Sequence, residues 1–120
     1  MLNLDTHILL ATFSGDLGEK ERDLIHGQHL AISNIVLWEI AKLAQLRRID
    51  IDFDGSIFRR AMRRITVYPI NAEIARQSTA LDFSSDPADE IIAATSIVEK
   101  IPLLTRDRRI LKSKIVPFAT

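Results

Sequence analysis

The chain has no cysteine, which excludes disulfide bonds, thiolate metal sites and thiol nucleophiles together. Glycine and proline are scarce, with 4 of each among 120 residues, and there is no repeat or low-complexity segment. No apolar run approaches the roughly 20 residues that span a bilayer. The amino terminus lacks the basic start and long apolar core of a secretory signal. These absences predict a soluble cytoplasmic protein.

The composition that remains is that of one globular domain over residues 1–120, with 47% apolar and 27% charged residues. The net charge of zero hides an uneven distribution. Residues 1–40 carry 2 basic and 6 acidic side chains, whereas residues 41–80 carry 8 basic and 4 acidic ones. Arginine suits phosphate, but solvated helix faces have the same composition. The pI of about 6.8 is also lower than that of a simple nucleic-acid binder.

Hydrophobic periodicity, caps and β-branched runs predict alternating strands and helices. We expect strands at 2–4, 30–32, 65–68 and 102–104, with an edge strand at 115–116. We expect helices at about 6–13, 19–28, 34–46, 56–64, 72–81, 87–99 and 108–112. In the fourth helix, which should follow a cap at the end of the loop 50–54, Ile57, Ala61 and Arg64 share one face. The alternation predicts an α/β fold whose mainly parallel sheet is covered on both faces.

Two aspartates follow predicted strands. Asp5 follows the first strand and Asp107 the fourth, so both should lie at the carboxyl edge of a parallel sheet, where such folds bind ligands. Each also has a structural explanation, because each precedes a predicted helix and can cap it. Taken singly, the capping explanation is the stronger one for both residues.

Glu39 lies in a helix that is apolar nearly all round. It can pair with Lys42 one turn on. If it is buried instead, its charge needs a partner such as a cation. Both interpretations stay open from the sequence.

Two further acids open the predicted helix 87–99. Asp86 precedes Pro87 and is interpreted mainly as a helix cap. Asp89 falls in the first turn, where the helix dipole favours an anion, and we interpret it as the chemical group of the two. With Asp5, Glu39 and Asp107 it forms an oxygen donor set suited to Mg²⁺. A metal held there would activate water and neutralise charge on a phosphodiester.

The acids lie in four segments: Leu4-Asp5-Thr6-His7, Trp38-Glu39-Ile40, Asp86-Pro87-Ala88-Asp89 and Leu103-Leu104-Thr105-Arg106-Asp107. In order and over nearly the whole chain, these segments resemble the PIN domain. Residues 69–75 also match the family's usual approach to the third segment. Within the family, the chain looks most like VapC-type toxins of bacterial toxin–antitoxin pairs.

The resemblance implies a three-layer α/β/α fold and an endoribonuclease dependent on Mg²⁺ or Mn²⁺. Asp5, Glu39, Asp89 and Asp107 would bind metal and position the attacking water, and Thr105 would assist through its hydroxyl. The resemblance further implies an RNA substrate cleaved to a 5′-phosphate and a 3′-hydroxyl, a homodimer, and inhibition by a cognate antitoxin. As toxin of such a pair, the protein would inhibit translation and growth.

One position departs from the family pattern: Glu90 stands where close relatives often have arginine. It removes no predicted ligand, so it bears on partner recognition more than on catalysis. Arg106 and Arg108 flank Asp107 and could contact an RNA backbone, although solvated residues near a helix cap would look the same. Trp38 is interpreted as core or dimer packing, and His7 either packs in the first helix or touches the active edge.

Three alternatives remain. A phospho-acceptor signalling domain also has an acidic magnesium site on such a sheet. It would need an aspartate ending the third strand, where this chain has Tyr68-Pro69. A PIN-like domain kept only for binding a partner is countered by acids at all four positions. A PIN-like RNA-processing nuclease outside a toxin–antitoxin pair has the same motifs.

Overall fold

Four short strands form one all-parallel sheet in the computed structural model, which describes residues 1–120. The strands are β1 (Leu2–Leu4), β2 (Leu30–Ser33), β3 (Ile65–Tyr68) and β4 (Leu103–Leu104). Their order across the sheet is β3-β2-β1-β4, so β1 pairs with both β2 and β4. Leu4 lies beside Leu104 in this register, which brings the chain after β1 next to the chain after β4. The predicted parallel sheet is confirmed.

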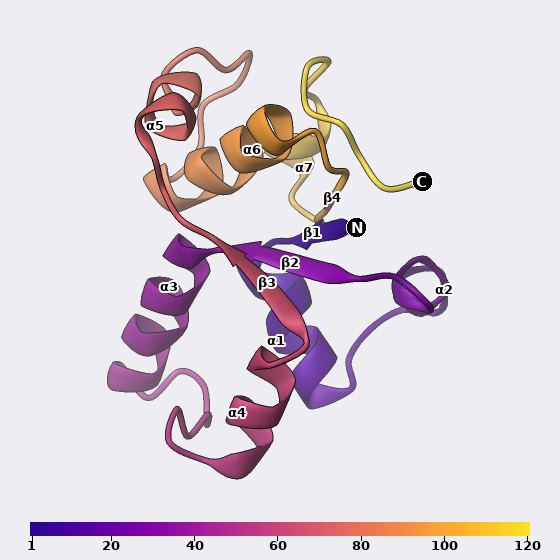
Figure 1. The fold of residues 1–120 in the computed structure, drawn as a ribbon, viewed down its shortest axis with the longest axis vertical. Coiled ribbons are helices and arrows are strands. Elements are labelled where there is room, and N and C mark those ends of the chain that lie inside the picture. Colours follow the sequence, from indigo (N-terminus) through magenta and orange to yellow (C-terminus); the bar gives the residue numbers. More distant parts are fainter.

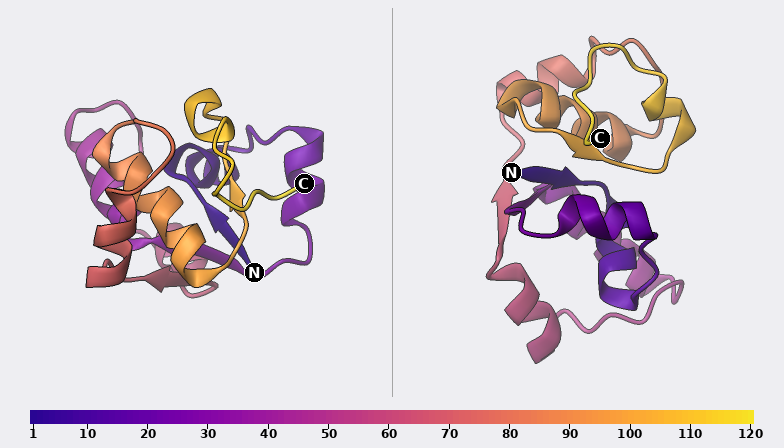
Figure 2. Two further views of the ribbon diagram at one scale, coloured as in Figure 1. Left: turned by 90° about the horizontal axis from the view of Figure 1, so that it is seen from above. Right: turned by 90° about the vertical axis from the view of Figure 1, so that its right-hand side faces the viewer.

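Seven helices surround the sheet: α1 (Thr6–Ser14), α2 (Glu19–Ile25), α3 (Asn34–Gln45), α4 (Ser56–Met62), α5 (Ala72–Ser78), α6 (Pro87–Glu99) and α7 (Arg108–Leu111). Figure 1 shows α5, α6 and α7 above the strands, with α1 and α4 below them. The side view of Figure 2 shows the same separation into helices, strands and helices. The three-layer α/β/α architecture is therefore confirmed. None of the helices is long and apolar enough to cross a membrane.

The core lies where β1 and β2 meet helices from both layers. Its fully buried side chains include Leu4, Ile8, Ile32, Ile40 and Ile92, each with no exposed surface. Short polar side chains start the helices around it. The Ser33 hydroxyl accepts the Ile35 N–H at 3.2 Å, and the side-chain amide oxygen of Asn71 accepts the Ile74 N–H at 2.9 Å. Both caps satisfy backbone donors that a helix start leaves unpaired.

The face of α4 that carries Ile57 is not the buried one. Ile57 is 79% exposed, whereas Phe58 is buried against Phe13 and Phe53, with ring centroids 5.9 and 4.6 Å away. An aromatic cluster therefore sets the rotation of this short helix, which periodicity over seven residues cannot do. The helix also begins after Gly55 rather than at a cap in the loop 50–54.

The predicted edge strand at 115–116 is also wrong. The Ser113 hydroxyl accepts the N–H groups of Ile115 and Val116 at 3.2 and 3.1 Å, which makes this segment a turn. The chain instead touches the sheet at Phe118, through an isolated parallel bridge to Leu103. A serine that captures nearby backbone donors competes with sheet pairing in this way.

Two helices end three residues earlier than expected, α2 at Ile25 and α5 at Ser78, and α4 ends two residues earlier, at Met62. After α2 the backbone reaches Gly27 with φ +75°, a conformation that favours glycine. Trp38 is 56% exposed, so its predicted place in the core is wrong. Its alternative role in a dimer stays a prediction.

Candidate active site

Asp5 lies between β1 and α1, and its side chain contacts both α1 and the chain after β4. It is 4% exposed. One carboxylate oxygen accepts the Ile8 N–H at 2.9 Å, which caps α1, and the other accepts the Thr105 hydroxyl. Burial, partly offset by these hydrogen bonds, raises the pKa of Asp5. The cap and the candidate metal ligand are therefore one side chain, with its second oxygen turned toward the chain after β4.

Thr105 joins two of the predicted acids. Its hydroxyl donates to Asp5 and accepts the backbone N–H of Asp107 at 3.0 Å. Asp107 in turn caps α7, with one oxygen 2.8 Å from the Arg109 nitrogen and 3.5 Å from the Ile110 nitrogen. Strand register thus brings the first and fourth segments together, as the sequence predicted.

Glu39 reaches the same edge from α3. Its Oε1 accepts the hydroxyl proton of Thr6 at 2.5 Å, and no ion pair with Lys42 forms. The Lys42 ammonium donates to Gln45 instead, at 3.1 Å. Burial raises the pKa of Glu39, and the charges of Asp89 and Asp5 raise it further. The solvent-facing pair that the sequence allowed is therefore wrong.

Asp89 lies half-buried in the first turn of α6. The Ser85 hydroxyl donates to its Oδ2 at 3.0 Å. Burial is the main cause of the raised pKa of Asp89, and repulsion from Asp107 and Asp86 adds to it. Asp86 occupies the cap position of α6 but makes no capping hydrogen bond with its side chain. Its side chain is exposed. The predicted capping role is therefore correct in position but not in side-chain bonding.

The four predicted acids form one electrostatic cluster although they come from four separate segments. Asp89 raises the pKa of both Asp5 and Glu39, and Asp107 raises that of Asp89. His7 lowers the pKa of Asp5, Glu39 and Asp89, so its exposed imidazole lies near the same cluster. Contact of His7 with this edge stays a prediction.

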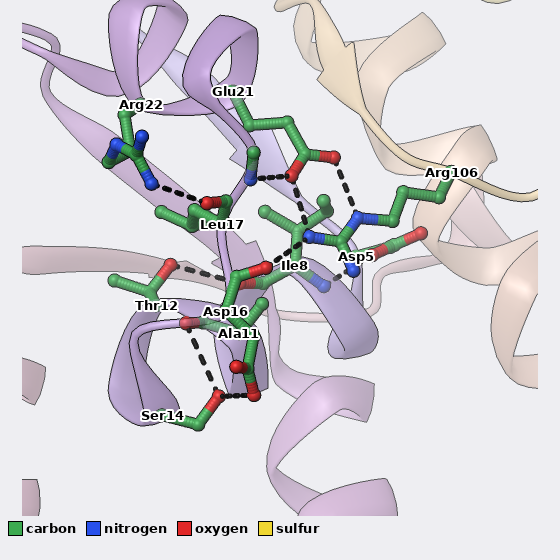
Figure 3. A network of polar contacts seen from close by, with 11 residues as sticks. Asp5, Ile8, Ala11, Thr12, Ser14, Asp16, Leu17, Glu21, Arg22 and Arg106 are labelled. Carbon is green, nitrogen blue, oxygen red and sulfur yellow. Dashed lines mark hydrogen bonds and ion pairs between the residues drawn. The ribbon is translucent and has the colours of Figure 1, made fainter.

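Arg106 has a different environment from the one predicted. Figure 3 shows its guanidinium held between Glu21 of α2 and the backbone of Asp16. Its Nε and Nη2 donate to the two Glu21 carboxylate oxygens at 2.7 and 2.6 Å, and Nη2 also donates to the Asp16 carbonyl at 2.9 Å. Arg108 is exposed. Contact of either arginine with RNA stays a prediction.

Comparison with known proteins places this arrangement in a family. The model of the PIN domain family matches residues 3–115. The chain belongs to the PIN domain family. Ribonuclease VapC22 of Mycobacterium tuberculosis is 33% identical to this PIN domain over 88 residues, which cover 71% of the chain and 68% of the relative.

Solved structures share the fold. A toxin–antitoxin complex from Klebsiella pneumoniae matches with a TM-score of 0.72 at 24% identity, over 93% of this PIN domain and 91% of that chain. VapBC2 of Rickettsia felis, bound to a DNA fragment from its promoter, matches with a TM-score of 0.71 at 16% identity, over 98% of this PIN domain and 97% of that chain. FitAcB of Neisseria gonorrhoeae matches with a TM-score of 0.67 at 18% identity, over 100% of this PIN domain and 97% of that chain.

The donor set of this PIN domain fits a hard divalent cation. All four acidic side chains offer oxygen, and burial with mutual repulsion disfavours the charged form of three of them, a cost that a cation would relieve. No three acidic or histidine side chains converge closely enough to hold an ion as they stand. Each carboxylate oxygen described above is turned to a neighbouring hydroxyl or N–H group.

Sequence reasoning missed two residues of this PIN domain that orient its acids, Thr6 and Ser85. Thr6 follows Asp5 directly, yet it is buried and turned toward Glu39. Ser85 precedes α6, and its N–H is also accepted by Glu90, at 3.3 Å. Glu90 therefore holds the loop before α6. A serine just before the Asp86-Pro87 helix start was the available signal, because such residues bond to first-turn groups.

Proposed function

We propose that this PIN domain is an endoribonuclease dependent on Mg²⁺ or Mn²⁺ and the toxin of a toxin–antitoxin pair. The observation that carries the proposal is the cluster of Asp5, Glu39, Asp89 and Asp107 at one sheet edge, with raised pKa values for the first three. Buried groups perturbed by mutual repulsion are typical of functional sites. The similarity to Ribonuclease VapC22 supports RNA as the substrate.

In this proposal the four acids hold the cation, which would supply an activated water and neutralise charge on the phosphodiester. The chain's own hydroxyls hold the ligands in place: Thr105 fixes the second oxygen of Asp5, Thr6 fixes Glu39 and Ser85 fixes Asp89. Such orienting contacts reduce the rearrangement needed when substrate arrives. Hydrolysis would leave a 5′-phosphate and a 3′-hydroxyl.

The test compares purified wild-type protein with Asp5→Asn on RNA, with Mg²⁺ or Mn²⁺ and with chelator. Asparagine is also a good helix cap, so α1 should still form. We expect chelator to stop cleavage, and Asp5→Asn to reduce it at least 100-fold because metal affinity and water activation are lost together. Asp23→Asn, at an exposed position of α2, is the matched control and should cleave like wild type. Cleavage that survives chelator or Asp5→Asn would exclude the metal mechanism.

The toxin role and partners need a separate test. The toxin–antitoxin complex from Klebsiella pneumoniae shares the fold and supports a protein partner of this kind. We expect induced expression to inhibit translation and arrest growth, and co-expression of a neighbouring small reading frame to restore growth. Light scattering of the purified protein tests the proposed homodimer. Growth unaffected by expression of an active nuclease would favour RNA processing outside a toxin–antitoxin pair.

A further inference from the structure

Asn3 is a polar side chain in the middle of β1 with no exposed surface. Its amide nitrogen donates two hydrogen bonds to α6, one to the Ile92 carbonyl at 3.2 Å and one to the Ser96 hydroxyl at 2.9 Å. Ser96 is itself fully buried. These bonds connect segments about ninety positions apart, so they fix how α6 sits on the sheet.

The two segments that Asn3 connects each carry a predicted metal ligand. Asp5 follows Asn3 by two residues, directly after β1, and both side chains are buried. Asp89 lies on α6 one turn before Ile92. A bond from Asn3 to the Ile92 carbonyl therefore constrains both the rotation of α6 and its position along its axis relative to β1. The same two quantities determine how far Asp89 lies from Asp5.

Stability alone does not explain an asparagine here. Its Oδ1 is buried without any hydrogen-bond partner, which opposes folding. A leucine would fill similar space in this apolar core without burying an unpaired acceptor. Leucine at this position would also leave no hydrogen-bond donor unpaired, because the Ser96 hydroxyl can donate to a carbonyl of its own helix. What leucine cannot provide is a directional link to α6, since apolar packing does not specify orientation in this way.

We propose that Asn3 is a positioning residue that sets the separation of Asp5 and Asp89 by anchoring α6 to β1. The proposal rests on the proposed function, in which these two acids bind the same cation. Asn3 touches neither metal nor substrate and acts only through the two elements it joins. Removing the anchor should therefore impair metal binding and turnover without weakening the fold.

The test compares Asn3→Leu and the milder Ser96→Ala with wild type. The readouts are the melting temperature, Mn²⁺ affinity by calorimetry without RNA, and kcat and KM on RNA. We expect Asn3→Leu to melt at or above the wild-type temperature yet to bind Mn²⁺ about 10- to 100-fold more weakly, as for lost groups that orient metal ligands. Its kcat should fall about 10-fold with little change in KM, because orientation rather than RNA binding is lost. Ser96→Ala keeps the bond to Ile92 and should lie between Asn3→Leu and wild type.

Ser113→Ala is the matched control, since Ser113 is also buried and also holds several hydrogen bonds, but in the turn after α7. It should lower the melting temperature and leave Mn²⁺ affinity unchanged. The proposal would be overturned if Asn3→Leu bound Mn²⁺ with the same affinity as wild type and had the same kcat. If Asn3→Leu fails to fold, Ser96→Ala decides: weaker Mn²⁺ binding at an unchanged melting temperature supports it, and unchanged binding contradicts it.

A wild-type protein that binds no Mn²⁺ would contradict the proposed function rather than the role of Asn3. Hydrogen–deuterium exchange of residues 87–99 then tests whether Asn3 anchors α6. Faster exchange around Ile92 in Asn3→Leu than in wild type, at equal global stability, would support anchoring of α6. Equal exchange rates would exclude it.

Discussion

Two predicted metal ligands are held in place by different helices and different interactions. Asp89 lies on α6, which is held by apolar burial, whereas the segment that carries Asp107 is tied to α2 by an ion pair. α6 buries six residues, among them Ile92, Ala93 and Ala94 with no exposed surface. α2 buries none, and Glu21 ties it to Arg106, between Thr105 and Asp107, through exposed charged groups. Apolar burial carries no charge to titrate or screen, whereas an exposed ion pair weakens with protonation and with salt. The Asp89 side of the site should therefore stay in place under conditions that loosen the Asp107 side.

The largest effect expected from this difference concerns core packing. Ile92→Ala should lower the free energy of unfolding by about 2–5 kcal/mol, because it leaves a cavity where α6 meets the sheet. Leu24→Ala is the matched truncation in α2, where the side chain is only partly buried against the core, and should cost about 1 kcal/mol. Urea unfolding followed by circular dichroism measures both.

Equal losses for the two truncations would mean that α2 depends on burial as much as α6 does. The contrast between the helices would then be wrong. A loss for Ile92→Ala below 1 kcal/mol would mean that the helix relaxes into the vacated space.

The second prediction concerns charge on the α6 side. Asp89→Asn should raise the free energy of unfolding at pH 7 in metal-free buffer, by less than Ile92→Ala lowers it. Burial and the nearby acids raise the pKa of Asp89, so the native state disfavours its charge. Asparagine removes that charge and still accepts the Ser85 hydroxyl proton. Because the folded pKa lies above the unfolded one, this gain should shrink as pH falls through the folded value toward the unfolded one.

Glu73→Asn supplies the comparison, since Glu73 is an exposed acid in the first turn of α5. That change removes a favourable dipole contact and should lower stability slightly. A clear loss of stability in Asp89→Asn would mean that the Asp89 carboxylate stabilises the start of α6 more than its neighbours repel it.

The parts that the sequence could predict are those decided locally. A strand of apolar residues followed by a capping acid predicted both β1 with Asp5 and β4 with Asp107, and parallel register then placed the two acids together. Glu39 was a candidate because its helix has little polar face, but the helix pattern left its pairing with Lys42 equally open. In these cases the local sequence pattern predicts the element and the capping acid, and parallel pairing brings the acids to one edge.

The parts that could not be predicted depend on long-range packing. Phe58 rather than Ile57 faces inward because Phe13 and Phe53 meet it there. Glu21 and Arg106 are 85 positions apart, and neither stands in a pattern that signals a pair. Asn3 interrupts an apolar strand, and only the position of α6 shows what it bonds to. Side-chain orientation in short elements is set by such partners, not by periodicity.

The smallest effect, and the one that separates the two helices most directly, concerns Glu21. Glu21→Gln should lower the free energy of unfolding by about 0.5–1 kcal/mol at pH 7 and low salt, because Arg106 is 44% exposed and solvent screens the pair. The Arg106 guanidinium lowers the pKa of Glu21 to about 2 from an ordinary value of 4.5. A carboxylate with a lowered folded pKa stabilises the protein above its unfolded pKa, and the contribution fades as pH falls from 4.5 to about 2.

The free energies of unfolding of wild type and Glu21→Gln should therefore differ at pH 7 and converge by about pH 2. They should also converge in 1 M salt, where the screening length is roughly 3 Å. Glu19→Gln removes an exposed acid from the first turn of the same helix and controls for the lost dipole contact. Ile92→Ala should show neither convergence, because burial carries no charge. A Glu21→Gln deficit that persists in high salt would show that the contact acts through geometry, as the two short bonds to one guanidinium would allow. The Asp107 side would then be as resistant to pH and salt as the Asp89 side.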